Sequence, residues 1–181
     1  MELRDAIKDR RSIKKFKRDM TIDEDKLYEA LNLATHAPNH CLREPWRVVH
    51  VPKDDLGAMS RKLSKIAFPK SEDKQESHYN AVTNLGGFLV VVAKRDPRQR
   101  EDNENMLAVG AFAQNLLLLL HEVGIGTCWK TPDYIFNPRV KDLFKVEADE
   151  SIVGFLYLTD LEDEFKAKPR KNDEYVSRFE G

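Results

Sequence analysis

Residues 102–131 decide the fold, and they read DNENMLAVGAFAQNLLLLLHEVGIGTCWKT. Between residues 106 and 121, apolar side chains occupy every face of a helix, and only Gln114 and Asn115 interrupt them. Such a pattern is typical of a helix that is covered on more than one side, and not of an amphipathic surface helix. A chain of this size can cover one side with its own sheet, so we expect a second copy of the chain to cover the rest.

A membrane-spanning helix is the competing interpretation of this stretch. Its clean apolar runs are shorter than the ~20 residues that a bilayer requires. The polar side chains of Gln114, Asn115, His121 and Glu122 would also lie in lipid. We therefore expect no membrane partner.

Two glycines end this helix. Gly124 favours a left-handed helix end, and Gly126 lets the chain turn directly into the segment that carries Trp129, Lys130 and Thr131. The predicted turn thus places an indole, an ammonium group and a hydroxyl at the end of the most buried element.

Composition excludes several classes of protein. The chain has 181 residues and a formal net charge of −1, with 41% hydrophobic and 34% charged residues, which suits a folded domain with a solvated surface. A nearly neutral chain argues against non-specific binding to nucleic acid. No signal peptide is visible, so the cytoplasm is the expected compartment. Cys41 and Cys128 lack metal or redox spacing and are expected to be structural thiols, and no metal site is expected.

A basic segment follows a short amphipathic helix predicted at residues 2–9. Residues 8–18, KDRRSIKKFKR, hold seven basic residues and one acid. By composition this segment could be a nucleic-acid or anion patch, a phosphate site or a solvated face. Arg10, Arg11 and Ser12 favour the phosphate site, because two guanidinium groups and a hydroxyl suit the oxygens of one phosphate monoester.

Further helices follow from capping patterns. Thr21 and Glu24 form a capping-box pattern ahead of a helix that Pro38 ends, and Asp54 or Asp55 caps the next helix.

The loop APNHCLREPW, residues 37–46, is held between two prolines. It is rigid and rich in hydrogen-bond donors, among them Asn39, His40 and Arg43, and so it suits ligand binding. A single histidine is nevertheless more often a surface or capping residue.

For two further segments, the sequence leaves alternatives open. Residues 70–79, KSEDKQESHY, are polar and aperiodic, so we expect a solvated helix start or a mobile loop with weak order. Asn137 and Pro138 predict a helix start. Arg139 lies in its first turn, where its charge opposes the helix dipole, so either a bound anion or chance explains its position.

Three apolar runs predict strands at residues 47–51, 88–93 and 151–158. The last two runs are unbroken and fit strands that are buried on both faces. The charged tail after residue 160 is expected to be frayed or packed on a partner subunit. Without repeats or linkers, the chain reads as a single α+β domain over residues 1–181, with a small central sheet flanked by helices.

Four separated motifs agree in order from about residue 3 to residue 160. They are Arg10-Arg11-Ser12, APNHCLREPWRVV, QNLLLLLHEVGIGTCWKT and IVGFLYL. Together they resemble the nitroreductase superfamily of FMN-dependent oxidoreductases, and in particular its small single-domain members. The resemblance implies an intertwined homodimer of α+β fold, with the long buried helix in the dimer core and two FMN sites at the subunit interface.

The resemblance also implies the residues that bind the cofactor. Arg10, Arg11 and Ser12 are expected to hold the FMN phosphate, with Arg139 and Arg170 as further basic residues near it. His36, Asn39 and His40 are expected to meet the flavin, and Trp129, Lys130 and Thr131 to line the edge of the isoalloxazine ring. A positive Lys130 near the N1–C2=O end would stabilise the anionic reduced flavin.

The implied activity is electron transfer from NAD(P)H through FMN to a small acceptor such as a nitroaromatic or a quinone, by a ping-pong mechanism. FMN performs the chemistry, so no catalytic protein residue is expected. The chain departs from the commoner family motif at Leu42, Arg43 and Glu44, which leaves the substrate open. One alternative is an FMN-binding protein that acts on a dedicated substrate with little nitroreductase activity. The other is a nucleic-acid or anion-binding module that uses residues 8–18.

Overall fold

The computed structural model describes residues 1–14, 20–161, 170 and 175–179. Residues 15–19 of the basic segment and most of the charged tail therefore lie outside the described part of the chain. The elements, in order, are α1 (Leu3–Asp9), α2 (Glu24–Ala34), η1 (His40–Leu42), β1 (Trp46–Val51), η2 (Lys53–Asp55), α3 (Leu56–Ala67), α4 (Glu72–Thr83), β2 (Gly87–Lys94), α5 (Gln99–Glu122), β3 (Gly126–Lys130), η3 (Asp133–Phe136), α6 (Pro138–Leu143) and β4 (Glu150–Thr159).

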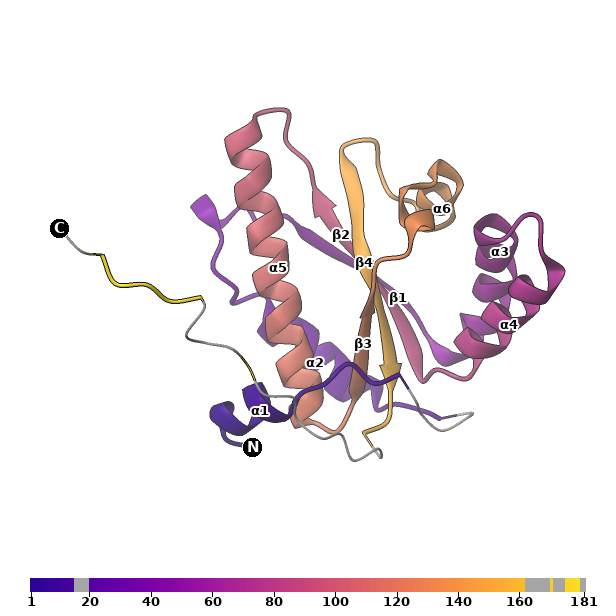
Figure 1. The fold of residues 1–181 in the computed structure, drawn as a ribbon, viewed down its shortest axis with the longest axis horizontal. Helices are drawn as coiled ribbons and strands as arrows, with labels where there is room; N and C mark the ends of the chain where they lie inside the picture. Colours follow the sequence, from indigo (N-terminus) through magenta and orange to yellow (C-terminus); the bar gives the residue numbers. More distant parts are fainter. Residues whose placement is uncertain (15–19, 162–169, 171–174, 180–181) are drawn as a thin grey trace.

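One antiparallel sheet lies at the centre, with its four strands in the order β1-β2-β4-β3 (Figure 1). Helices α2 and α5 cover one face, and α3, α4 and α6 lie on the other (Figure 1). This arrangement confirms the α+β class with a small sheet flanked by helices. Among the described residues, no helix is long and apolar enough to cross a membrane.

Strand β2 is apolar on both faces because each face meets a separate core. Leu89 and Val91 pack with Phe112 and Leu116 of α5 on one side. Phe88, Val90 and Val92 pack on the other side, in the core that α3, η3 and α6 share with the sheet. The unbroken apolar run at residues 88–93 predicted this double burial.

Among the described residues, helix α5 is not covered on all sides. Phe112, Leu116 and Leu120 are almost fully buried, whereas the side chain of Leu107 is 75% exposed. Leu118 and Leu119 are half-buried. The chain's own sheet therefore covers one face of the helix, as predicted, and an apolar face remains open.

Residues 126–130 form an edge strand, where the sequence predicted only a turn. Thr127 is opposite Leu158 and Lys130 is opposite Phe155 in the antiparallel pairing of β3 with β4. Strand β4 supplies this pairing from far along the chain, so a local pattern of five residues could not reveal it. The left-handed helix end is confirmed, because Gly124 has φ +84°.

The capping box predicted at the start of α2 is wrong. Asp23 is the N-cap, and its side chain accepts a hydrogen bond from the backbone N–H of Lys26 at 3.3 Å. Aspartate caps a helix as well as threonine does, and here it immediately precedes the first helical residue, Glu24.

Of the two alternatives for residues 70–79, the helix start is confirmed, because most of this segment belongs to helix α4, and the weak order expected there is wrong. Ser71 accepts a hydrogen bond from the backbone N–H of Lys74 (3.4 Å) and so caps the helix. The Gln75 side chain donates to the carbonyl of Phe68 at 2.8 Å. His78, described below, adds further contacts to α3 and η3. Polar tertiary contacts thus stabilise a helix that has no apolar periodicity.

Candidate functional site

The N-terminal segment runs along the outer edge of β3. The backbone N–H of Ile13 donates to the carbonyl of Thr127 at 2.8 Å, and Ser12 forms a parallel bridge with the same residue. At its other end, the α-amino group of Met1 pairs with Glu122, the last residue of α5, at 3.2 Å. These contacts hold Arg10, Arg11 and Ser12 beside β3 and close to the C-terminal end of α5.

Three arginines gather there, and within the described ranges none of them forms an ion pair. Burial, and then the nearby charges of Arg11 and Arg170, lower the pKa of Arg10. Arg11 donates to the backbone carbonyls of Lys8 and Arg10, and no described carboxylate pairs with any of these three guanidinium groups. Unpaired guanidinium groups close together form a site for an anion with several oxygens, such as a phosphate. The structure therefore brings Arg10, Arg11 and Arg170 close together, with Ser12 next to them in the chain.

Strand β3 leads from this cluster to Trp129, Lys130 and Thr131. Thr131 lies about 13 Å along the strand direction from Thr127, at ~3.3 Å per residue. Trp129 and Lys130 point to opposite faces of the sheet, as neighbours in a strand do. The ammonium nitrogen of Lys130 lies 5.9 Å from the centre of the Tyr157 ring. These three residues therefore lie farther along the same edge of the sheet than the arginines.

Gly154 in β4 makes room for the Trp129 indole. A Cβ atom at residue 154 would lie 2.1 Å from the Trp129 Nε1. This nitrogen is buried and has no hydrogen-bond partner within the described part of the protein.

The loop before β1 has an unusual backbone. Cys41, Leu42 and Glu44 have φ values of 55°, 49° and 46°, in the left-handed region that side chains disfavour. Each such residue costs on the order of 1 kcal/mol, and such strain is often found at functional sites. Asn39 holds the loop in shape, because its Oδ1 accepts from the N–H of Glu44 at 2.9 Å and its Nδ2 donates to the carbonyl of Ala37 at 3.2 Å.

This loop is anchored at the far end of α5 from the arginines. Arg43 pairs with Glu104 at 3.1 Å. Glu104 and Glu122 are ~27 Å apart along the helix, at 1.5 Å per residue. Within one chain, Asn39 and His40 therefore do not meet the arginine cluster, and the predicted site residues form two separate groups.

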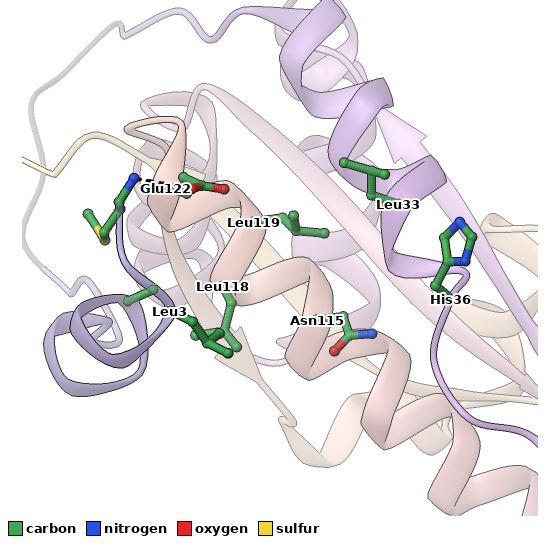
Figure 2. Close-up of a pocket in the computed structure, with 9 residues that line it drawn as sticks. Leu3, Leu33, His36, Asn115, Leu118, Leu119 and Glu122 are labelled. Atoms are coloured by element: carbon green, nitrogen blue, oxygen red, sulfur yellow. Dashed lines mark hydrogen bonds and ion pairs between the residues drawn. The ribbon is translucent and has the colours of Figure 1, made fainter.

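A pocket lies between the two groups, on the open face of α5. It has a volume of about 450 Å³, and Figure 2 shows that α1, α2 and α5 contribute its walls. His36 lines this pocket. The other lining residues are mostly apolar and comprise Met1, Leu3, Ala6, Leu33, Asn115, Leu118, Leu119 and Glu122.

Of the four arginines predicted to lie near the FMN phosphate, Arg139 is placed away from the other three. It is exposed on α6, on the face of the sheet away from α5 (Figure 1). Its backbone N–H is capped by the Asn137 side chain at 3.0 Å, which explains the start of α6 without an anion.

His121 is a residue of this region that the sequence did not single out. It lies in the last turn of α5, and both of its ring nitrogens are buried. The only sequence feature that could have found it is a histidine at the end of an otherwise apolar run. Within the described ranges, no group of three or more His, Cys, Asp or Glu side chains could hold a metal ion.

Comparisons with known proteins agree on one family. The model of the nitroreductase family matches residues 7–158. YfhC of Bacillus subtilis (strain 168), named as a candidate NAD(P)H nitroreductase, is 32% identical over 160 residues, which cover 85% of this chain and 81% of that protein. The crystal structure of a nitroreductase-like family protein from Bacillus cereus matches 100% of this chain and 97% of its own, with a TM-score of 0.85 and 29% identity. The FMN- and NADPH-dependent nitroreductase NfnB from Sphigopyxis sp. strain HMH shares the fold, with a TM-score of 0.73 and 16% identity over 100% of both chains.

Proposed function

The chain belongs to the nitroreductase family of FMN-dependent NAD(P)H oxidoreductases, and on this premise we propose that it reduces a small organic acceptor, such as a nitroaromatic or a quinone. NAD(P)H and the acceptor use the same site in turn, in a ping-pong cycle. Bound FMN supplies the redox chemistry, and the residues of the chain bind it, orient it and set its electrostatic surroundings.

The arginine cluster beside β3, which pairs with no carboxylate of the described residues, is the observation that supports this function most strongly. A phosphate monoester carries nearly two negative charges at neutral pH, and it offers oxygens to Arg10, Arg11, Ser12 and Arg170 together. The residues present therefore fit the phosphate end of FMN. We assign the ring end to Trp129, Lys130 and Thr131, farther along the same strand.

We propose that a second copy of the chain completes the site. The open face of α5 and its pocket expose apolar side chains of α1 and α2, including Leu3 (66% exposed) and Leu33 (44% exposed). A second copy packed on this face would bury them and bring its own His36, Asn39 and His40 toward the ring. A cytoplasmic homodimer is consistent with Cys41 and Cys128, which are both free thiols.

Steady-state kinetics test which class of acceptor the protein reduces. Purified protein loaded with FMN is mixed with NADH or NADPH and a panel of nitroaromatics and quinones. We expect turnover with at least one acceptor, and parallel lines in double-reciprocal plots, as a ping-pong cycle requires. Reduction of the bound flavin without turnover on any acceptor would contradict this proposal and favour a dedicated substrate.

The basic segment provides a second control. The nucleic-acid alternative requires salt-sensitive binding of DNA or RNA through residues 8–18. We expect no such binding, and substitution of Lys14 by alanine should leave FMN affinity unchanged, because this residue is not assigned to the phosphate.

A further inference from the structure

The two ring nitrogens of His121 are the starting point. Each has essentially no contact with solvent and no hydrogen-bond partner among the described residues. A buried polar atom without a partner costs about 1–3 kcal/mol, and native proteins contain few of them. Two on one ring, at the edge of the proposed cofactor site, call for a functional explanation.

The charges around His121 come from the segment that follows α1. Burial, followed by the charges of Arg10 and Arg11, lowers the pKa of the imidazole, while Asp9 acts in the opposite direction. On α5 itself, the neighbouring Glu122 is engaged by the α-amino group of Met1. The ring is therefore neutral at pH 7 in the free protein, although the C-terminal end of a helix would favour its cationic form.

We propose that His121 is a further phosphate-binding residue, which takes up a proton from solvent when the phosphate of FMN binds. This inference rests on the proposed function, because it requires that Arg10 and Arg11 hold that phosphate. The phosphate cancels the repulsion that the two arginines exert on an imidazolium ion. One phosphate oxygen also accepts a hydrogen bond from one ring N–H group, so a charge-assisted contact replaces one of the two unpaired states. No covalent bond to FMN is made or broken.

Nuclear magnetic resonance of the full chain tests the protonation directly. The sequence contains five histidines, so the ring signals of isotopically labelled protein can be assigned with His→Gln variants. We expect the pKa of His121 to rise when FMN binds and to stay low with riboflavin, which has the same ring without the phosphate. An unchanged pKa of His121 in the FMN complex would overturn the proposal.

The variant His121→Gln tests the contribution to binding, because glutamine keeps a donor but cannot gain a proton. We expect the Kd for FMN at pH 6.5 to rise about tenfold, and the Kd for riboflavin to stay within about twofold. Calorimetry in two buffers should show more proton uptake on FMN binding by the wild type than by the variant. The phosphate's own titration near pH 6 contributes equally to both proteins and cancels in the difference.

His50→Gln is the matched control. Burial also lowers the pKa of His50, but this residue lies on β1, where its Nδ1 is 3.1 Å from the Tyr28 hydroxyl. The His50→Gln variant should show the FMN binding and the proton uptake of the wild type. Equal FMN affinity and equal proton uptake in wild type and His121→Gln would refute the inference alone. Wild type that binds neither FMN nor riboflavin would refute the proposed function. If His121→Gln does not fold, the titration of His121 in the wild type still tests the proposal.

Discussion

Arg10 is the residue on which the cofactor assignment depends most. It is half-buried beside Arg11 and Arg170, with no described carboxylate to pair with it. We predict that Arg10→Ala raises the Kd for FMN by about tenfold or more, because a charge-assisted phosphate contact is worth roughly 1.5–3 kcal/mol. Riboflavin should bind almost unchanged. Quenching of flavin fluorescence measures both affinities.

Arg139→Ala is the control for this prediction. It removes the same charge from an exposed position on α6 that lies away from the cluster. Equal loss of FMN affinity in the two variants would contradict the phosphate site, because it would mean that overall charge, and not position, governs binding.

Gly154 gives a prediction about stability. A methyl group at this position would lie 2.1 Å from the Trp129 Nε1 and 3.0 Å from the carbonyl oxygen of Lys130. We predict that Gly154→Ala lowers the free energy of unfolding by about 1–3 kcal/mol, as overpacking of a core does. Urea titration measures the change. In the control Gly57→Ala, the nearest new contact is the Tyr79 hydroxyl at 3.7 Å, so an unchanged or slightly more stable protein is expected.

At the scale of elements, a network of polar side chains joins α3, α4 and η3. The His78 Nδ1 lies 2.8 Å from the Ser64 hydroxyl, and its Nε2 lies 3.0 Å from the Tyr134 hydroxyl. Burial raises the pKa of the Tyr134 hydroxyl to about 12. These hydrogen bonds hold the polar helix α4 against α3 and η3.

The hydrogen bonds of His78 predict how the stability of the protein depends on pH. Burial lowers the pKa of His78 below its usual 6.5, so the unfolded state binds this proton first as the pH falls. The stabilising contribution of neutral His78 is complete above pH 6.5 and is lost as the pH falls toward its folded-state pKa. We predict that His78→Gln flattens the loss of unfolding free energy between pH 7.5 and about pH 5. Urea midpoints measure the slope, and the exposed His40→Gln should keep the slope of the wild type.

Elements that carry their own pattern could be read from the sequence. Three such predictions are confirmed: the apolar helix, the strands at residues 88–93 and 151–158, and the helix start at Asn137-Pro138. Burial on both faces and helix capping each depend on residues that are close together in the sequence. Strand β3 could not be predicted, since its pairing partner β4 lies far along the chain. Helix α4 was predicted only as one of two alternatives, since its polar contacts, such as that of His78 with Ser64, leave no apolar periodicity.

The candidate site was only partly readable for the same reason. Arg10, Arg11 and Ser12 are neighbours in sequence, so their gathering was predictable. Their proximity to His121 depends on the path of the chain past α5, which no local pattern specifies. The separation of Asn39 and His40 from the arginines was also invisible, because a sequence does not say which copy of a chain supplies a residue.

At the scale of the whole molecule, the open face of α5 predicts the assembly. Leu119 is half-buried at the pocket between α1, α2 and α5. We predict that Leu119→Arg converts a dimer into a monomer of 21.0 kDa and weakens FMN binding, because an arginine would be buried without a partner at the interface. Light scattering after size-exclusion chromatography measures the mass.

Phe136→Arg is the matched control for assembly. Phe136 is 77% exposed on η3, outside the pocket, and the variant should remain a dimer with wild-type affinity for FMN. A wild-type chain that is monomeric and still binds FMN tightly would contradict the shared site.

The visible absorbance spectrum of the purified full chain, recorded before and after anaerobic addition of NAD(P)H, tests the central claim most directly. We predict the two-band spectrum of oxidised flavin, which bleaches when the reductant is added. A protein that shows no flavin spectrum, even after incubation with FMN, would contradict the account.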